Sequence, residues 1–414
     1  MGITQNDDAQ EIRGGSTGAI IGNNSDRLKV NAQASNDDLN TSQRQRVSNN
    51  NVIFSGYFVN DDRDLLFNSK TTGGGAVSRN STTRNMELTV GTADGDYAAY
   101  QSRYQSYTPS HAQVVYCTAT FDTNQSNLIQ RVGYFDDNDG LFFEYDSTGF
   151  YVVVRTSETG SPVDTRVEQA SWNTDVASDL DLNDIQFLSI DFNWGGGVYR
   201  FGYLDTNGER TIVHEGQASN VLSTKFMTTA NLPLRFEIQN DGATSGSSTL
   251  KMHSGVVSTE GEEEQPTAQH AIDNDTSTRS ISSGSFSTIL AVRLKSGFHR
   301  AQLVPSDIGF ISTTNDDVLV RVYYNATITG GSWTSAGANS IAEYNDSMTG
   351  FSGGELVASK YVSKQGGEPL DLGATQLVLQ SDFDGTTLDN IIIVAKTFSG
   401  SAGGAASIIF TELY

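Results

Sequence analysis

Short β-prone runs separated by turn residues fill the chain after its first fifty residues. In Val198–Leu204, the side chains of Tyr199, Phe201 and Tyr203 share one face, because the side chains of a strand alternate with period two. Asn-Gly and Asp-Gly steps, as in Asp205–Gly208, supply the positive φ that tight hairpins need. No long segment carries the 3.6-residue apolar period of an amphipathic helix. The sequence therefore predicts an all-β protein.

Residues 1–50 differ in composition from the rest of the chain. They are rich in Asn, Asp, Gln, Ser and Gly and contain no aromatic residue. So little apolar surface cannot offset an ordering cost of roughly 1–2 kcal/mol per residue for the backbone. We expect an extended attachment arm that becomes ordered against a partner, and its apolar island supplies the expected contacts, Ile20, Ile21, Leu28 and Val30. A disordered leader without a role is the alternative.

A second boundary falls at residues 259–278. Glu260 and the run Glu262–Glu264 are followed by Pro266 and a polar stretch, which is typical of a solvated acidic linker. Residues 51–258 and 279–414 on either side each carry many short strands, and this spacing predicts two β-sandwiches, the second a sandwich or jelly roll. The apolar final strand, Ser407–Tyr414, needs a partner strand or a cap, because an open apolar edge invites aggregation.

Charge and composition exclude several classes of protein. The chain has 49 Asp and Glu against 26 Lys and Arg, a formal net charge of −23, which repels nucleic-acid phosphates. One cysteine allows neither an internal disulfide nor a thiolate zinc site. The longest apolar runs, Tyr151–Val154 and Ile391–Ala395, are far too short to cross a bilayer, so no membrane insertion is expected.

The run Asp136–Gly140 is the nearest approach to a metal-binding motif. A calcium loop that starts at Asp136 needs Gly at its sixth position and Glu at its twelfth, but Gly140 is fifth and Ser147 is twelfth. A tight turn between two aromatic strands is favoured, with an adventitious calcium site left open. The glycine runs Gly73–Gly75 and Gly195–Gly197 open no helix and precede no Lys-Ser/Thr pair, so no metal or cofactor is predicted.

No arrangement of catalytic residues stands out. A β-sandwich glycosidase needs two carboxylates across the scissile bond. Glu144-Tyr-Asp146 is the nearest match on one strand, but no second glutamate follows it. None of the five histidines lies beside a Gly-x-Ser-x-Gly elbow. We therefore expect no enzymatic activity and name no catalytic residue.

Aromatic residues on or near glycine-rich loops are the remaining candidates for binding. Trp194 precedes three glycines and Trp333 follows Gly330-Gly-Ser332, so both are candidate ligand contacts. The alternative, which is favoured, is that both side chains pack into their sandwiches. A third cluster holds four tyrosines around Arg103 and fits an interface as well as a core: Tyr97, Tyr100, Tyr104 and Tyr107.

Several strings resemble a family of virion structural proteins of tailed bacteriophages. They are Gln130–Glu144, Leu188–Trp194 with Tyr199–Tyr203, Asn231–Ile238, Thr314–Val320 with Thr329–Trp333, and the leader Ile20–Val30. The resemblance implies a concanavalin-A-like first sandwich, a second sandwich and a place on the particle surface. It implies no catalytic residue.

The expected function is thus a non-enzymatic structural component of a phage particle, attached to head, neck or tail proteins through Ile20, Ile21, Leu28 and Val30. Fold-level analogy favours a homotrimer. The alternative is an adhesin or receptor-binding protein that binds a host surface glycan through Trp194 or Trp333. A glycan depolymerase is the third, disfavoured hypothesis, because the carboxylate pair is incomplete.

Overall fold

The computed structural model describes residues 23–24, 27–28, 50–109, 111–261, 268–274, 278–313, 316–372 and 377–414. Within the predicted arm it describes only β1 (Asn23–Asn24), paired antiparallel with β2 (Arg27–Leu28), and the start of β3 (Asn50–Tyr57). The side chains of the predicted attachment residues Ile20, Ile21, Leu28 and Val30 lie outside the described part.

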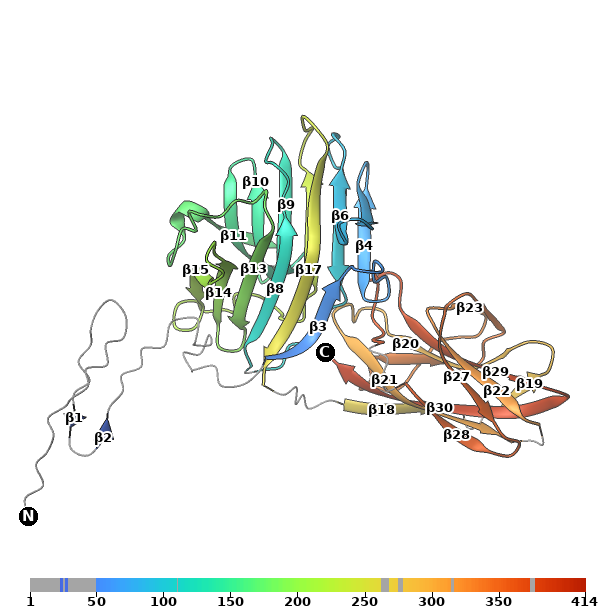
Figure 1. Cartoon of the computed structure of the whole chain (residues 1–414). Helices are drawn as coiled ribbons and strands as arrows, with labels where there is room; N and C mark the ends of the chain where they lie inside the picture. The colour runs from blue at the N-terminus through green and yellow to red at the C-terminus, as the bar shows by residue number, and fades with distance from the viewer. Residues whose placement is uncertain are drawn as a thin grey trace, which may run out of the picture.

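Two antiparallel sheets form the first sandwich (Figure 1). The seven-stranded sheet has the order β12 (Val163–Glu168), β11 (Gly149–Thr156), β10 (Gly140–Asp146), β9 (Leu128–Phe135), β16 (Leu234–Asn240), β7 (Tyr97–Ser102), β4 (Phe67–Thr72). The eight-stranded sheet has the order β15 (Arg210–Gln217), β14 (Val198–Leu204), β13 (Gln186–Asn193), β8 (Gln113–Thr120), β17 (Ser248–Glu260), β6 (Asn85–Val90), β5 (Ala76–Asn80), with β3 also paired to β17.

Period-two alternation builds the core between these sheets. On β9, Val132 and Tyr134 point inward and are fully buried, and on β16 Phe236 and Ile238 do the same. Burial of such a side chain contributes about 1.5–3 kcal/mol. The residues that alternate with these along each strand, Arg131 among them, therefore face outward from the seven-stranded sheet. The inward set forms one core cluster with members from Phe54 to Val257.

The second sandwich packs a five-stranded sheet against a six-stranded one. The five-stranded sheet has the order β18 (Ala268–Asp273), β30 (Ser401–Leu413), β21 (Gln302–Ser312), β28 (Gly367–Asp371), with β19 (Arg279–Ser282) also on β30. The six-stranded sheet has the order β24 (Thr334–Ser335), β25 (Ala342–Asn345), β20 (Ser287–Leu294), β29 (Asn390–Thr397), β22 (Val318–Tyr324), β27 (Glu355–Val362). β23 (Thr327–Thr329) and β26 (Gly350–Ser352) form a separate two-stranded antiparallel sheet.

The second core is separate from the first, with members from Ile272 to Phe410. The final strand, β30, is paired on both sides, by β18 and β19 on one edge and β21 on the other. The expectation that this strand needs a partner is met within the chain. β18 lies inside the range 259–278 that the sequence predicts as an acidic linker. A strand forms there because this segment pairs with β30 and buries Ile272.

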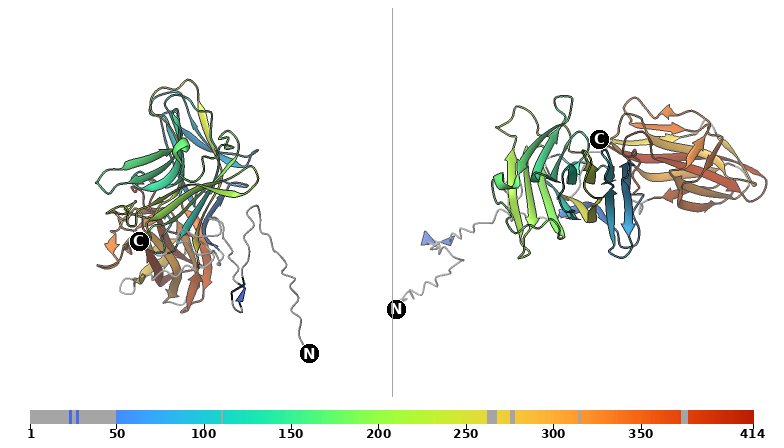
Figure 2. Two further views of the ribbon diagram at one scale, coloured as in Figure 1. Left: turned by 90° about the vertical axis from the view of Figure 1, so that its left-hand side faces the viewer. Right: turned by 90° about the horizontal axis from the view of Figure 1, so that it is seen from above.

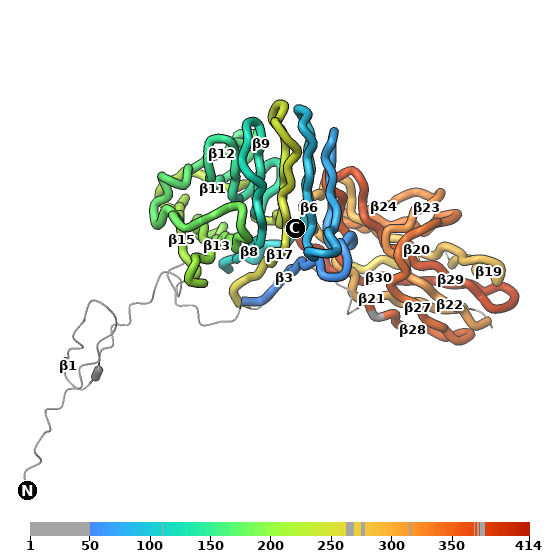
Figure 3. Tube along the Cα trace, turned by 45° about the horizontal axis from the view of Figure 1, so that its top comes forward, coloured from blue at the N-terminus to red at the C-terminus, as the bar shows by residue number. Residues whose placement is uncertain are grey.

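Figures 2 and 3 show the second sandwich beside the β4 edge of the first. Buried polar contacts join them. Arg103 Nη1 lies 2.7 Å from Asp389 Oδ2, and both side chains are 8% exposed. The backbone N–H of Tyr104 donates to Gln380 Oε1 at 2.9 Å, and Gln380 Nε2 donates back to the Tyr104 carbonyl at 2.8 Å. Paired buried charges of this kind require a fixed geometry, so the two sandwiches are held in one relative orientation.

The prediction of an all-β protein built from β-sandwiches is confirmed. In the described residues the one helical segment is a 3-10 turn, η2 (Gln169–Ser171). No helix in the described ranges has the length and apolar character to cross a membrane.

Candidate functional site

Charged side chains form a row across the outer face of the seven-stranded sheet. Arg131 on β9 is the register partner of Glu144 on β10 and of Glu237 on β16. Side chains directly opposite one another in a sheet point to the same face. The pairing therefore places one arginine between two glutamates, at the middle of the sheet.

The contacts in this row are short and buried. Arg131 Nε lies 2.6 Å from Glu144 Oε2, and Arg131 Nη1 lies 2.6 Å from Glu237 Oε1. Arg166 Nε binds the other oxygen of Glu144 at 2.7 Å. The exposed fractions of the Glu144 and Glu237 side chains are 4% and 5%. Each buried carboxylate is thus neutralised by arginine, as burial of a charge requires.

Burial by itself would raise the pKa of Glu237, but the charges of Arg131 and Arg235 outweigh it and hold that pKa below its usual range. The same balance lowers the pKa of Asp137, where Arg235 outweighs burial. Burial, together with the charge of Glu237, raises the pKa of Tyr97. Tyr97 therefore keeps its proton and donates to Glu237 Oε2 at 2.9 Å.

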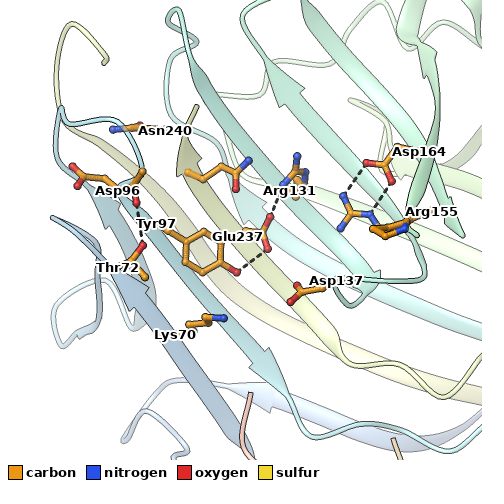
Figure 4. Close-up of a pocket in the computed structure, with 13 residues that line it drawn as sticks. Lys70, Thr72, Asp96, Tyr97, Arg131, Asp137, Arg155, Asp164, Glu237 and Asn240 are labelled. Atoms are coloured by element: carbon orange, nitrogen blue, oxygen red, sulfur yellow. Dashed lines mark hydrogen bonds and ion pairs between the residues drawn. The ribbon is translucent and has the colours of Figure 1, made fainter. Parts of the chain in front are cut away.

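A groove of about 600 Å³ opens beside this row (Figure 4). Figure 4 shows Tyr97 reaching Glu237 on the floor, with Arg155 and Asp164 on one side and Thr72 and Asp96 on the other. Most of the lining side chains are polar, and the lining comes from β4, β7, β9, β11, β12, β16 and the loops beside them: Lys70, Thr72, Gly95, Asp96, Tyr97, Arg131, Asp137, Arg155, Pro162, Asp164, Glu237, Gln239 and Asn240.

One wall of the groove is braced by a small aromatic cluster on the same face. Phe135 and Phe142 are buried with ring centroids 4.5 Å apart. Arg155 lies 5.0 Å over the Phe142 ring and binds Asp164 through two contacts of 2.8 Å. Gly133 makes room for this packing, because a Cβ there would lie 2.6 Å from the Phe142 backbone. Arg155 is therefore fixed in place.

The second sandwich contacts Arg235 and Lys70 of the first sandwich, close to the groove. Arg235 lies between two rings, 5.3 Å from the centroid of Phe135 and 4.3 Å from that of Phe383. Lys70, which lines the groove, pairs with Asp384. Since Phe383 and Asp384 belong to the second sandwich, that sandwich supports side chains at the groove without lining it.

Chemically, the groove offers polar side chains that are held by ion pairs and hydrogen bonds. Gln239 is half-buried in the lining, and the structure records no side-chain hydrogen bond for it among the described residues. Its amide can both donate to and accept from a ligand. Amides, ion-paired carboxylates and arginines at fixed positions suit recognition of a hydroxyl-rich ligand by hydrogen bonds.

The predicted ligand contacts Trp194 and Trp333 do not line this groove. Trp194 is half-buried against the first core, donates through Nε1 to the Met227 carbonyl at 3.0 Å, and has Lys225 Nζ 3.5 Å above its ring. Trp333 is half-buried on the second sandwich, with the Arg293 guanidinium 4.0 Å above its ring. The structure places them on different sandwiches and brings neither to the groove.

The tyrosine cluster around Arg103 divides between core, interface and groove. Tyr100, Tyr104 and Tyr107 are buried, whereas Tyr97 lines the groove. Arg103 itself lies at the junction of the sandwiches, where it pairs with Asp389. Both interpretations left open by the sequence therefore apply, to different members.

The acidic turn Asp136–Gly140 connects β9 to β10. The carboxylate of Asp136 accepts from the backbone N–H groups of Asn138 and Asp139 at 2.8 and 2.9 Å. Arg300 of the second sandwich binds Asp136 at 2.7 and 2.8 Å and Asp139 at 3.2 Å. In the described ranges no group of three or more His, Cys, Asp or Glu is placed to hold a metal ion. The turn instead links the two sandwiches.

Sequence reasoning missed Arg131, Arg235 and Glu237 as site residues. Their signal was the alternation of charged and apolar residues in Leu234-Arg-Phe-Glu-Ile238 and Gln130-Arg-Val. Alternation places the charges on one face, but only the strand order brings β9, β10 and β16 together.

Neither the comparison with protein-family models nor that with curated proteins gave a match. Among solved structures, a peanut lectin with a nine-residue peptide is 12% identical, covers 50% of this chain and 96% of its own, and has a TM-score of 0.29. A glycoside hydrolase family protein from Mycobacterium thermorestibile is 10% identical over 50% and 100%, with a TM-score of 0.37. A glycoside hydrolase family 16 endo-glucanase from Bacteroides ovatus is 10% identical over 50% and 100%, with a TM-score of 0.35. Likeness at this level says nothing about function.

Proposed function

We propose that this chain is a non-enzymatic surface component of a bacteriophage particle and that its first sandwich binds a host glycan in the groove on the seven-stranded sheet. The observation that supports binding is the groove itself, with its buried row of Glu144, Arg131 and Glu237 and the free amide of Gln239. A fixed polar lining loses little entropy when a sugar binds, which favours affinity.

Binding without cleavage follows from the ionisation of the carboxylates. A glycosidase needs one carboxylic acid that donates its proton to the glycosidic oxygen of the leaving group. Arg131 and Arg235 keep the pKa of Glu237 low, and Arg131 and Arg166 both bind Glu144. Glu237 is thus held as an anion and Glu144 is ion-paired with two arginines, an arrangement that suits hydrogen-bond acceptance from sugar hydroxyls rather than proton donation.

A glycan array probed with the full chain tests this proposal. We expect binding to at least one host-surface glycan and an affinity at least tenfold lower for Gln239→Ala. The matched control is Gln217→Ala, an exposed glutamine on β15 of the opposite sheet, which should bind as the unchanged chain does. Absence of binding to every glycan, or equal loss in both variants, would contradict the proposal.

Incubation with the bound glycan separates binding from depolymerisation. We expect no increase in reducing ends over a day at neutral pH. Release of oligosaccharides that stops in Glu144→Gln or Glu237→Gln would make the chain a depolymerase instead.

The particle assignment is supported by the resemblance of Gln130–Glu144, Leu188–Trp194 and Asn231–Ile238 to phage virion proteins. Two sandwiches joined through the buried Arg103–Asp389 ion pair also suit a structural component of a particle surface. Gold-labelled antibody against the chain should decorate intact particles of the phage that encodes it. Light scattering should give three times the 44.6 kDa of one chain if the homotrimer is correct. Unlabelled particles would contradict the assignment to the virion.

A further inference from the structure

The outer face of the six-stranded sheet in the second sandwich is only partly covered. Met348, in the segment before β26, packs with Ala291, Ile392 and Val394 in the middle of the sheet, and the two-stranded sheet of β23 and β26 adds Ile328 and Phe351 to this cover. Beyond that cover, the register places Tyr361 on β27 opposite Leu319 on β22, and Leu319 opposite Lys396 on β29. We call this row, together with Arg321, Phe286 and Phe398, the outer strip.

Two cations in the outer strip have no carboxylate partner in the described part of the chain. The Arg321 guanidinium lies 4.8 Å and Lys396 Nζ lies 5.4 Å from the centroid of the Phe286 ring. Arg321 Nη1 reaches only the Tyr323 hydroxyl, at 3.3 Å, and its Nε is buried with no hydrogen-bond partner among the described residues. In a chain with 49 acidic and 26 basic residues, two adjacent cations without an acid are an available anion site.

Aromatic surface lies beside these cations. Tyr361 and Phe398 are stacked with centroids 5.8 Å apart and an interplanar angle of 29°. Their side chains are 71% and 58% exposed. Adjacent exposed rings offer an apolar surface on which a ligand ring can stack.

We propose that the outer strip is a second glycan site, specific for an acidic polysaccharide. Its carboxylate or sulfate groups pair with Arg321 and Lys396, and the apolar faces of its sugar rings stack on Tyr361 and Phe398. A saccharide is favoured over an acidic peptide because the exposed rings of Tyr361 and Phe398 lie side by side and suit the apolar faces of sugar rings. β27, which carries Tyr361, is an edge strand of the six-stranded sheet, so the competition with poly-glutamate described below tests the peptide. The strip is on the other sandwich from the groove and does not depend on it.

Binding of the full chain to immobilised polygalacturonate, dextran sulfate and neutral dextran at 0.15 M salt tests this assignment. We expect binding to at least one of the two charged polymers and none to dextran. The carboxylate and sulfate arms identify the acidic group. Arg321→Gln with Lys396→Gln should weaken binding at least tenfold, and Lys364→Gln, an exposed lysine of the same sandwich, should not. Binding to dextran, or to none of the polymers, would overturn the proposal.

Two further measurements separate stacking from charge. Tyr361→Ala with Phe398→Ala removes two exposed rings without touching the core, so it should weaken polysaccharide binding several-fold while the unfolding transition stays in place. Poly-glutamate should displace the polysaccharide poorly. Equal displacement by poly-glutamate, or full affinity in the double alanine variant, would overturn the saccharide assignment. Gln239→Ala should bind the charged polymer normally, so failure of the groove and failure of the strip are distinguishable.

Discussion

The outer faces of the two sandwiches use charge in opposite ways. On the first, Arg131 lies between the buried carboxylates of Glu144 and Glu237, and its own side chain is only 12% exposed. On the second, Arg321 is opposite Val394 in register, and Lys396 is opposite Leu319, so neither faces an acid. The difference shows that the residue opposite in register decides whether a charged side chain on a sheet face forms an ion pair within the fold or stays available to a ligand.

The largest expected effect comes from breaking the buried row. Arg131→Ala leaves two buried carboxylates without their shared partner, which should lower the free energy of unfolding by about 3–5 kcal/mol. Arg321→Ala removes a partly exposed cation from the Phe286 ring and should cost about 0.5–1 kcal/mol. Urea denaturation of both variants measures the contrast. Equal losses would mean that the two faces do not differ as described.

A second contrast concerns acid. The folded-state pKa of Glu237 lies below its usual value, so its ionised form contributes stability at neutral pH. That contribution is lost as pH falls below the unfolded pKa, about 4.3, toward the folded one, at about 1.4 kcal/mol for each unit of lowering. Denaturation between pH 7 and pH 3 should show this loss, and Glu237→Gln should flatten it. An unchanged acid limb in Glu237→Gln would show that Glu237 is not held ionised.

The contact of the second sandwich with Arg235, close to the groove, gives a smaller effect. Phe383→Leu keeps an apolar side chain but removes the ring 4.3 Å from Arg235, and should cost about 1–2 kcal/mol. Because Arg235 also holds Asp137 and Glu237, glycan affinity at the groove should fall as well. A differential scanning calorimetry trace of this variant that matches the unchanged chain would show that the ring does not support the groove.

The smallest effect is expected for Lys396→Gln. Lys396 is half-buried and makes no ion pair in the described ranges, so the free energy of unfolding should change by less than about 0.5 kcal/mol. Thermal unfolding provides the measurement. A loss above 1 kcal/mol would mean that Lys396 supports the fold rather than a ligand.

Strand alternation predicted most of the fold but little of the site. In Val198–Leu204 the inward set follows from period two, and Phe201 and Tyr203 are buried as that pattern requires. Arg131 and Glu144 lie on consecutive strands, but Glu237 is 106 residues from Arg131, so its place in the row depends on strand order, which local pattern does not encode. For the same reason Phe383, which lies in a polar loop of the second sandwich, gave no sign of its contact with Arg235.

Amide hydrogen exchange of the full chain, with and without a saturating glycan from the array, tests the central claim most directly. Binding in the groove should slow exchange in β7, β9 and β16 and leave β22 and β29 unchanged. Protection confined to β22 and β29, or none on the seven-stranded sheet, would contradict it.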